Sequence, residues 1–208
     1  MTRRSLLIWA VRTLVLIGVV FPRRRALAQP AWTVSPAATG DAFELAAIFN
    51  SHIQEGKCPY VERASPWSTE RAQQFLMDYD ATLLIKRNGT TVGFAGLVDY
   101  TTATGRLSIL PGVAPEITVF AIAASRLRHD EQLNAAKRLG AAVARKLNAM
   151  GFEKCEMLIK ADPIFSSDTW FRRHMTVDHV ERKAGADYAL RVNLDLASVE
   201  SGLQAEGL

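Results

Sequence analysis

Patterns that bind metals or carry nucleophilic catalysis are missing from the sequence. Its 208 residues include two cysteines and four histidines. The histidines, His52, His129, His174 and His179, are scattered. No spacing resembles a zinc site, a Cys-x-x-Cys pair, or a serine or cysteine elbow. We therefore expect no metal site and interpret the histidines as surface residues or as hydrogen-bonded core residues.

The scarcity of cysteine limits covalent cross-linking to a single disulfide. Cys58 and Cys155 could pair if the protein is exported, closing a long loop worth about 4–5 kcal/mol in the chain-entropy model. Two buried thiols are the alternative and are slightly preferred. Because the sequence gives no distance between them, the pairing stays open.

The folded part of the chain lacks an excess of charge of either sign. The formal net charge is +4, but six arginines lie within the first 25 residues. They are Arg3, Arg4, Arg12, Arg23, Arg24 and Arg25. Without them the chain is close to neutral, so nothing indicates a nucleic-acid partner. Repeats and low-complexity segments are also missing, and the length suits one domain with a full core.

Residues 1–28 are predicted to be a targeting leader. Residues 2–7, which contain a pair of arginines, resemble the twin-arginine export signal, and an apolar run follows at 14–21. Residues 26–28 then match the A-x-A cleavage pattern. Arg12 interrupts the apolar part, and the remainder is short for a bilayer, so membrane contact is expected only through this leader. Export to the periplasm is the expected outcome, and a cytoplasmic protein with a misassigned start codon is the alternative.

The strongest pattern is a strand–helix–strand unit in the middle of the chain. Residues 116–124 are mostly apolar and β-branched, which is typical of a strand buried on both faces. After Asp130, apolar residues recur every three or four positions until Met150, which predicts an amphipathic helix that Gly151 ends. Residues 154–159 form the next strand. This order predicts a right-handed βαβ unit, whose helix start presents free amides suited to a phosphate.

This unit resembles the acetyl-CoA-binding core of the GNAT acyltransferase superfamily. The resemblance rests on the buried strand, an arginine-containing turn, small residues at the helix start and Gly151-Phe152 at its end. In that family an Arg/Gln-x-x-Gly-x-Gly/Ala turn holds the cofactor pyrophosphate with main-chain amides, and here the turn falls on residues 131–136. Ala136 fits the last position, but Asn134 replaces a glycine and Glu131 an arginine or glutamine, so the motif is degenerate. The resemblance implies these acetyl-CoA-binding residues: Ile122, Ala123, Ala124, Arg128, Gln132, Leu133, Asn134, Ala135 and Ala136.

The whole chain predicts an α/β fold, with a mixed, mostly antiparallel central sheet of six to seven strands flanked by about four helices. Before the central unit we expect a strand at 31–35, a helix after Asp41, a helix after Ser68 and a hairpin over 82–98 that turns at Asn88-Gly89. A short helix near 166–173 and strands at 177–181 and 188–194 follow it. The predicted domain spans 31–197, and 198–208 is expected to be a C-terminal tail.

The expected chemistry centres on Glu116. Direct acyl transfer needs a base for the substrate amine, an amide that polarises the thioester carbonyl and an acid for the thiolate. Glu116 opens the central strand as Glu-Ile-Thr-Val-Phe, which resembles the phosphinothricin-acetyltransferase-like branch of the family, as does the segment 47–56. It is the candidate base, and a solvated charge at a strand end is the alternative. The family's tyrosine acid is missing, because Trp170 and Phe171 stand at its position.

The resemblance implies an acetyl-CoA-dependent N-acetyltransferase that acts on a small amine or amino-acid-like substrate by direct transfer. Main-chain groups at 122–124 would hold the pantetheine arm, and Arg126, Arg128 or Arg145 could meet phosphates. The alternative is a non-catalytic, exported GNAT-fold protein that binds another ligand or a partner. The degenerate motif, the missing tyrosine and the leader favour it. The sequence names neither the substrate nor the oligomeric state, so a homodimer stays open.

Overall fold

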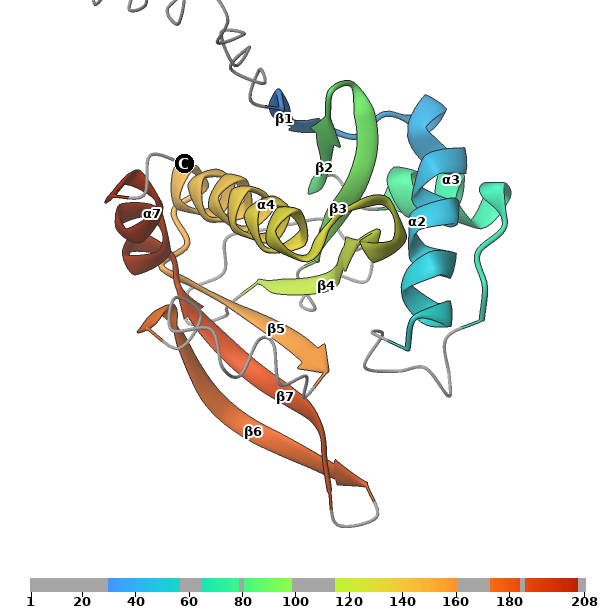
Figure 1. The fold of residues 1–208 in the computed structure, drawn as a ribbon. Helices are drawn as coiled ribbons and strands as arrows, with labels where there is room; N and C mark the ends of the chain where they lie inside the picture. The colour runs from blue at the N-terminus through green and yellow to red at the C-terminus, as the bar shows by residue number, and fades with distance from the viewer. Residues whose placement is uncertain are drawn as a thin grey trace, which may run out of the picture. The chain divides into compact units, whose positions relative to one another are not determined.

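The fold is described by a computed structural model, which covers residues 30–56, 65–78, 81–98, 115–160, 173–183 and 186–205. All helices and strands named below belong to the unit Trp32–Leu208, drawn in Figure 1. Some predicted features lie outside the described residues. They are the leader over 1–28, Cys58, and most of the short helix near 166–173, including Trp170 and Phe171.

One mixed sheet forms the centre of the fold. Its strands are β1 (Trp32–Pro36), β2 (Ala81–Arg87), β3 (Thr90–Val98), β4 (Glu116–Ile122), β5 (Lys154–Lys160), β6 (Met175–Lys183) and β7 (Ala186–Asp195). The helices are α2 (Ala42–Gln54), α3 (Thr69–Asp78), α4 (His129–Ala149) and α7 (Leu196–Ala205), with 3-10 turns η1 (Thr39–Asp41) and η2 (Ala124–Arg126). The strand order is β1-β2-β3-β4-β5-β7-β6. Among these described strands only β4 and β5 are parallel neighbours, and α4 connects them, as the sequence predicted.

Local sequence signals explain several boundaries. Asn88 (φ 50°) and Gly89 (φ 82°) both adopt positive φ and make the predicted two-residue turn between β2 and β3. The Ser68 hydroxyl accepts a hydrogen bond at 3.2 Å from a backbone amide in the first turn of α3, which confirms the predicted cap. The Asp41 carboxylate accepts one at 2.9 Å from the Ala38 amide, so it caps η1 instead of α2.

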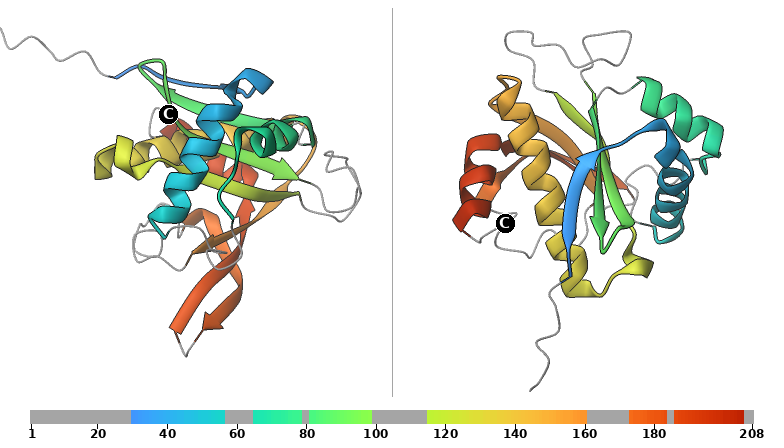
Figure 2. Two further views of the ribbon diagram at one scale, coloured as in Figure 1. Left: turned by 90° about the vertical axis from the view of Figure 1, so that its right-hand side faces the viewer. Right: turned by 90° about the horizontal axis from the view of Figure 1, so that it is seen from above.

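Helices cover both faces of the sheet, with α4 and α7 on one face and α2 and α3 on the other (Figure 2). Side chains alternate along β2 and divide the core accordingly. Leu83 and Ile85 belong to the cluster under α4 and α7, whereas Leu84 belongs to the cluster under α2 and α3. The Trp67 ring packs against the second cluster and stacks on Phe49 with ring centroids 4.2 Å apart, so Trp67 is a packing residue.

Two segments differ from the sequence prediction. Helix α4 begins at His129, so residues 131–136, which were predicted to form a turn, are instead the first turns of a helix. The physical reason is a cap from inside the helix, since the Glu131 carboxylate accepts a hydrogen bond from the Arg128 amide at 3.1 Å. Whether residues 131–136 contact a cofactor phosphate stays a prediction. The segment predicted to be a C-terminal tail forms most of α7, whose buried Val199 belongs to the core cluster under α4.

Candidate functional site

The parallel strands β4 and β5 separate soon after they meet. They are paired only at Glu116↔Glu156 and Ile117↔Met157, and Figure 1 shows them diverging from there. Along the rest of its length, β4 is paired with β3 alone among the described strands. The other edge of β4 therefore offers backbone groups to which an extended ligand chain could bond in the manner of an added strand.

Glu116 lies at the point where this edge begins. Its backbone stands between Val98 of β3 and Glu156 of β5 in the sheet register. The described part of the structure includes its backbone and not its side chain. Its role as the base for a substrate amine therefore stays a prediction.

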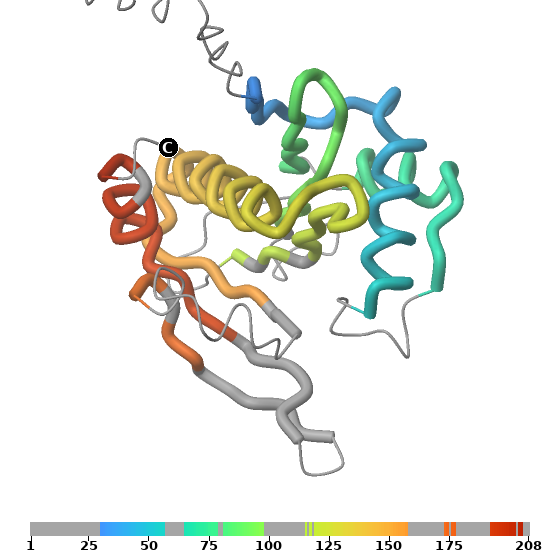
Figure 3. Tube along the Cα trace, in the orientation of Figure 1, coloured from blue at the N-terminus to red at the C-terminus, as the bar shows by residue number. Residues whose placement is uncertain are grey.

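A tight turn leads from the end of β4 into α4, and the trace can be followed in Figure 3. The Ala123 amide donates to the Val92 carbonyl at 2.8 Å, which fixes the end of the strand. The Gln132 side chain folds back over η2 and donates to the carbonyls of Leu127 at 3.0 Å and Ala124 at 3.3 Å. Gln132, predicted to bind the cofactor, thus holds the shape of the turn.

Arg126 ties the same turn to the opposite face of the sheet. Its guanidinium donates to the Glu44 carboxylate of α2 at 3.0 Å and to the Thr91 carbonyl of β3 at 2.9 Å. The predicted phosphate ligand Arg126 is therefore engaged by groups of the chain itself.

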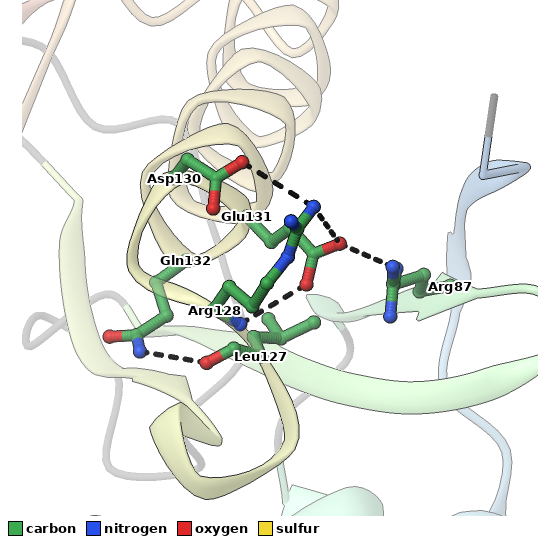
Figure 4. A network of polar contacts seen from close by, with 6 residues as sticks. All are labelled: Arg87, Leu127, Arg128, Asp130, Glu131 and Gln132. Carbon is green, nitrogen blue, oxygen red and sulfur yellow. Dashed lines mark hydrogen bonds and ion pairs between the residues drawn. The ribbon is translucent and has the colours of Figure 1, made fainter. Parts of the chain in front are cut away.

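The Glu131 carboxylate occupies the start of α4, as the close view in Figure 4 shows. One oxygen accepts the Arg128 amide at 3.1 Å, and the other accepts the Arg128 guanidinium at 3.2 Å and the Arg87 guanidinium. Only 8% of the Glu131 side chain is exposed, compared with 76% of the Arg128 side chain. A helix start attracts anions, and here the chain supplies one of its own.

The same contacts set the protonation of this carboxylate. The hydrogen bond from the Arg128 amide lowers the pKa of Glu131, and the guanidiniums of Arg128 and Arg87 lower it further, against the opposing effect of burial. The hydrogen bond to Glu131 in turn raises the pKa of Arg128. Glu131 is thus ionised at neutral pH and acts as a permanent anion at the helix start.

The remaining predicted cradle residues lie further along α4. Ala135 and Ala136 are buried in the core cluster, and Leu133 packs against that cluster. The Asn134 side chain accepts a hydrogen bond from the Arg138 guanidinium at 2.8 Å along the helix. The structure therefore brings Arg128 and Gln132 to the turn and places the others in the body of the helix. Their assignment as cofactor contacts stays a prediction.

Arg145, the third predicted phosphate ligand, lies in a separate groove between β1 and α4. The groove has a volume of about 340 Å³ and is lined by Trp32, Val34, Arg138, Ala142 and Arg145. No sequence pattern predicts this groove, because it joins an edge strand to a helix that is distant along the chain.

Other chemistry is limited in the described part of the chain. Burial raises the pKa of the Cys155 thiol to about 12, and this thiol is free. Among the described residues there is no group of three or more potential metal ligands, and no described helix is long and apolar enough to cross a membrane. The His174 imidazole lies 2.7 Å from the Ser198 hydroxyl, so it is a hydrogen-bonded histidine, as predicted.

No family model and no curated protein matches the sequence. Solved structures do match. YncA from Salmonella typhimurium, described as an acetyltransferase and solved with its cofactor acetyl-CoA, is 14% identical, with a TM-score of 0.59 over 80% of this chain and 94% of that chain. A structure described as a phosphinothricin N-acetyltransferase is 15% identical, with a TM-score of 0.58 over 80% and 99%. A GNAT-family acetyltransferase from Streptococcus pneumoniae is 12% identical, with a TM-score of 0.60 over 78% and 98%. The chain thus has the mixed α/β fold of the GNAT acetyltransferases, as its sequence predicted.

Proposed function

We propose that this chain is an N-acyltransferase that moves an acetyl group from a pantetheine-type thioester, such as acetyl-CoA, directly to the amine of a small or amino-acid-like molecule. The observation that carries the proposal is the separation of β4 from β5 after two paired positions, next to the turn into α4. An extended thioester arm fits the β4 edge that this separation leaves. The structure from Salmonella typhimurium with the same fold was solved with acetyl-CoA, which supports the choice of donor.

The chain's own residues define what the site would do. Backbone groups of β4 and of the turn at 122–124 would orient the arm, and Glu116 at the start of the strand would take the proton from the substrate amine. The donor supplies an acyl group activated as a thioester, whose leaving sulfur must be protonated. Trp170 and Phe171, which stand at the position of the family's tyrosine, have no phenol, so water would protonate that sulfur in its place.

We also propose that the protein is exported. The arginine pair, the apolar run and the A-x-A pattern of residues 1–28 support a twin-arginine-like leader, through which alone the chain would contact a membrane. A cytoplasmic location with a misassigned start codon is the competing proposal.

Acetyl transfer can be tested directly on the full chain. The protein is incubated with acetyl-CoA or S-acetyl-pantetheine and a panel of amines and amino acids, and the acetylated amine is detected by mass spectrometry. A Glu116→Gln variant should lower the rate by roughly 10²–10⁴-fold, because it removes the base and leaves the β4 edge intact. Failure of both donors with every amine would contradict the proposal, and an unchanged rate in Glu116→Gln would contradict the role of Glu116.

One observation favours a second candidate, a non-catalytic protein that binds another ligand or a partner through this fold. The buried Glu131 carboxylate lies at the helix start, in the segment that by its resemblance to the family would hold the donor pyrophosphate, and two guanidiniums already contact it. Binding of pantetheine without any acetyl transfer, on the same panel of amines, would favour this second candidate.

A further inference from the structure

Resting on the proposed function, we infer that the Glu131 carboxylate takes the place of a donor phosphate. The chain then recognises its acyl donor by the pantetheine-type arm, and a diphosphate on the donor adds no binding affinity. The class of donor is then any acyl thioester with such an arm, whatever group follows it.

The carboxylate is built into the helix start and is not a solvated surface charge. It accepts hydrogen bonds from the Arg128 amide and guanidinium, at 3.1 and 3.2 Å, and contacts the Arg87 guanidinium from β2 (Figure 4). Among the described residues, Glu131 is the one charged residue that is buried, with 6% of its surface exposed. Charge-assisted hydrogen bonds of this kind are about twice as strong as neutral ones, so the contacts hold the carboxylate in the anion position.

The cations around the turn are balanced by the chain itself. Arg87 and Arg128 face Glu131, and Arg128 also pairs with Asp130 at 3.6 Å. Two guanidiniums therefore face two carboxylates, and their charges cancel. Arg126, the third cation of the turn, is paired with Glu44. A diphosphate approaching α4 would find no uncompensated cation among these side chains, and the positive end of the helix dipole is already shared by two carboxylates.

A diphosphate could displace the Glu131 carboxylate from the helix start only at a cost in free energy. A diphosphate that took over the guanidiniums of Arg87 and Arg128 would leave the buried Glu131 carboxylate with only the Arg128 amide as a donor and next to a like charge, which is unfavourable. The edge of β4 lies outside this cluster and stays available to an arm. The residues present thus fit the arm of a CoA-type donor and do not fit its diphosphate.

The inference is tested by titration calorimetry of the full chain with CoA and with pantetheine. Wild-type protein should bind the two within about threefold of each other, or about 0.65 kcal/mol. In Glu131→Gln, which keeps the shape and removes the charge, CoA should bind on the order of tenfold more tightly, a gain of about 1.4 kcal/mol, while pantetheine binding is unchanged.

Asp130→Asn is the matched control. It removes one negative charge at the same helix start, but the Asp130 side chain is 73% exposed and does not fill the anion position. It should change CoA binding much less than Glu131→Gln does. Equal gains in the two variants would overturn the inference, because they would show only a general effect of charge.

Two further outcomes would also overturn it: wild-type protein that binds CoA at least tenfold more tightly than pantetheine, or no binding of either compound by both proteins. The wild-type comparison decides the question alone if Glu131→Gln does not fold. If Glu131→Gln gains affinity for CoA while no thioester transfers its acetyl group, the inference stands and the proposed function fails.

Discussion

Gly93 of β3 lies against the strand that carries the candidate site. A Cβ atom added there would lie 2.5 Å from the Ile122 Cδ1, 2.7 Å from the Ala121 carbonyl oxygen and 3.1 Å from the Ile85 Cγ2. The end of the Ile122 side chain can rotate away, but the Ala121 carbonyl is fixed in the ladder between β3 and β4. Gly93→Ala must therefore push β4 itself.

The size of the effect follows from this contact. Overpacking a close-packed interior costs about 1–3 kcal/mol. In a domain of this size each kcal/mol shifts Tm by about 2–4 °C, so we expect Tm to fall by about 2–12 °C. The urea midpoint should fall with the slope of the unfolding transition unchanged. Because β4 moves, pantetheine binding should weaken as well.

Gly140→Ala provides a matched control, since it makes the same substitution where nothing lies within 4 Å of the added Cβ. Gly140 is inside α4, where alanine is favoured over glycine by about 0.5–1 kcal/mol, so this variant should be more stable than wild type and bind pantetheine as before. A Gly93→Ala protein as stable as wild type, or two variants that shift the midpoint equally, would refute the assigned contact between β3 and β4.

Three more outcomes are expected. Because the pKa of Glu131 is lowered in the fold, its stabilising effect should be complete above the ordinary glutamate pKa of about 4.3 and be lost at lower pH, so the stability gap between wild type and Glu131→Gln in urea titrations should close on acidification. In a Cys58→Ser background, the buried Cys155 thiol should resist a disulfide reagent at pH 8 until urea unfolds the protein, and fast labelling of the native protein would contradict its burial. If the leader is cleaved, N-terminal sequencing of protein from the exported fraction should begin at Gln29, whereas intact Met1 in a cytoplasmic fraction would exclude export.

Features set by neighbouring residues were predictable from the sequence. The turn between β2 and β3 needs two residues that tolerate positive φ. Asn88 and Gly89 meet this requirement independently of how the strands pack in the fold. The apolar run of β4 and the periodic face of α4 likewise reflect burial along a single element. Each of these features depends on residues that are close together in the sequence, so the order of the helices and strands could be predicted from them.

The start of α4 was not predictable in the same way. Arg128 precedes the helix and has no side-chain acceptor for a cap, so the pattern gave no reason to begin the helix there. The cap comes from Glu131, whose buried charge is stabilised by Arg87, a residue 44 positions earlier on strand β2. The sequence marked Glu131 as an exception to the family motif, but only the fold shows what the exception does.

Helix α7 was missed because its evidence is also distant. Leu196 and Val199 are three apart, which is weak evidence in a ten-residue segment at the end of a chain. They are buried because α7 packs against α4. The Asn148 side chain of α4 also donates a hydrogen bond to the Glu200 carboxylate at 3.0 Å. A short amphipathic segment thus becomes a helix only when its partner surface is known.

The location of the protein depends on the leader, whereas binding of the proposed donor depends on β4 in either location. If the leader exports the chain, acetyl-CoA is not expected in its compartment, and a donor recognised by its arm is what the filled helix start allows. If the chain stays in the cytoplasm, acetyl-CoA is present in its compartment. The diphosphate of acetyl-CoA would still face arginines whose charges are already balanced by Glu131 and Asp130. If the inference about Glu131 holds, the strand edge supplies most of the free energy of donor binding in either compartment. The strand shift caused by Gly93→Ala should therefore weaken binding of every donor, whereas Glu131→Gln should alter the affinity only for donors that carry a diphosphate.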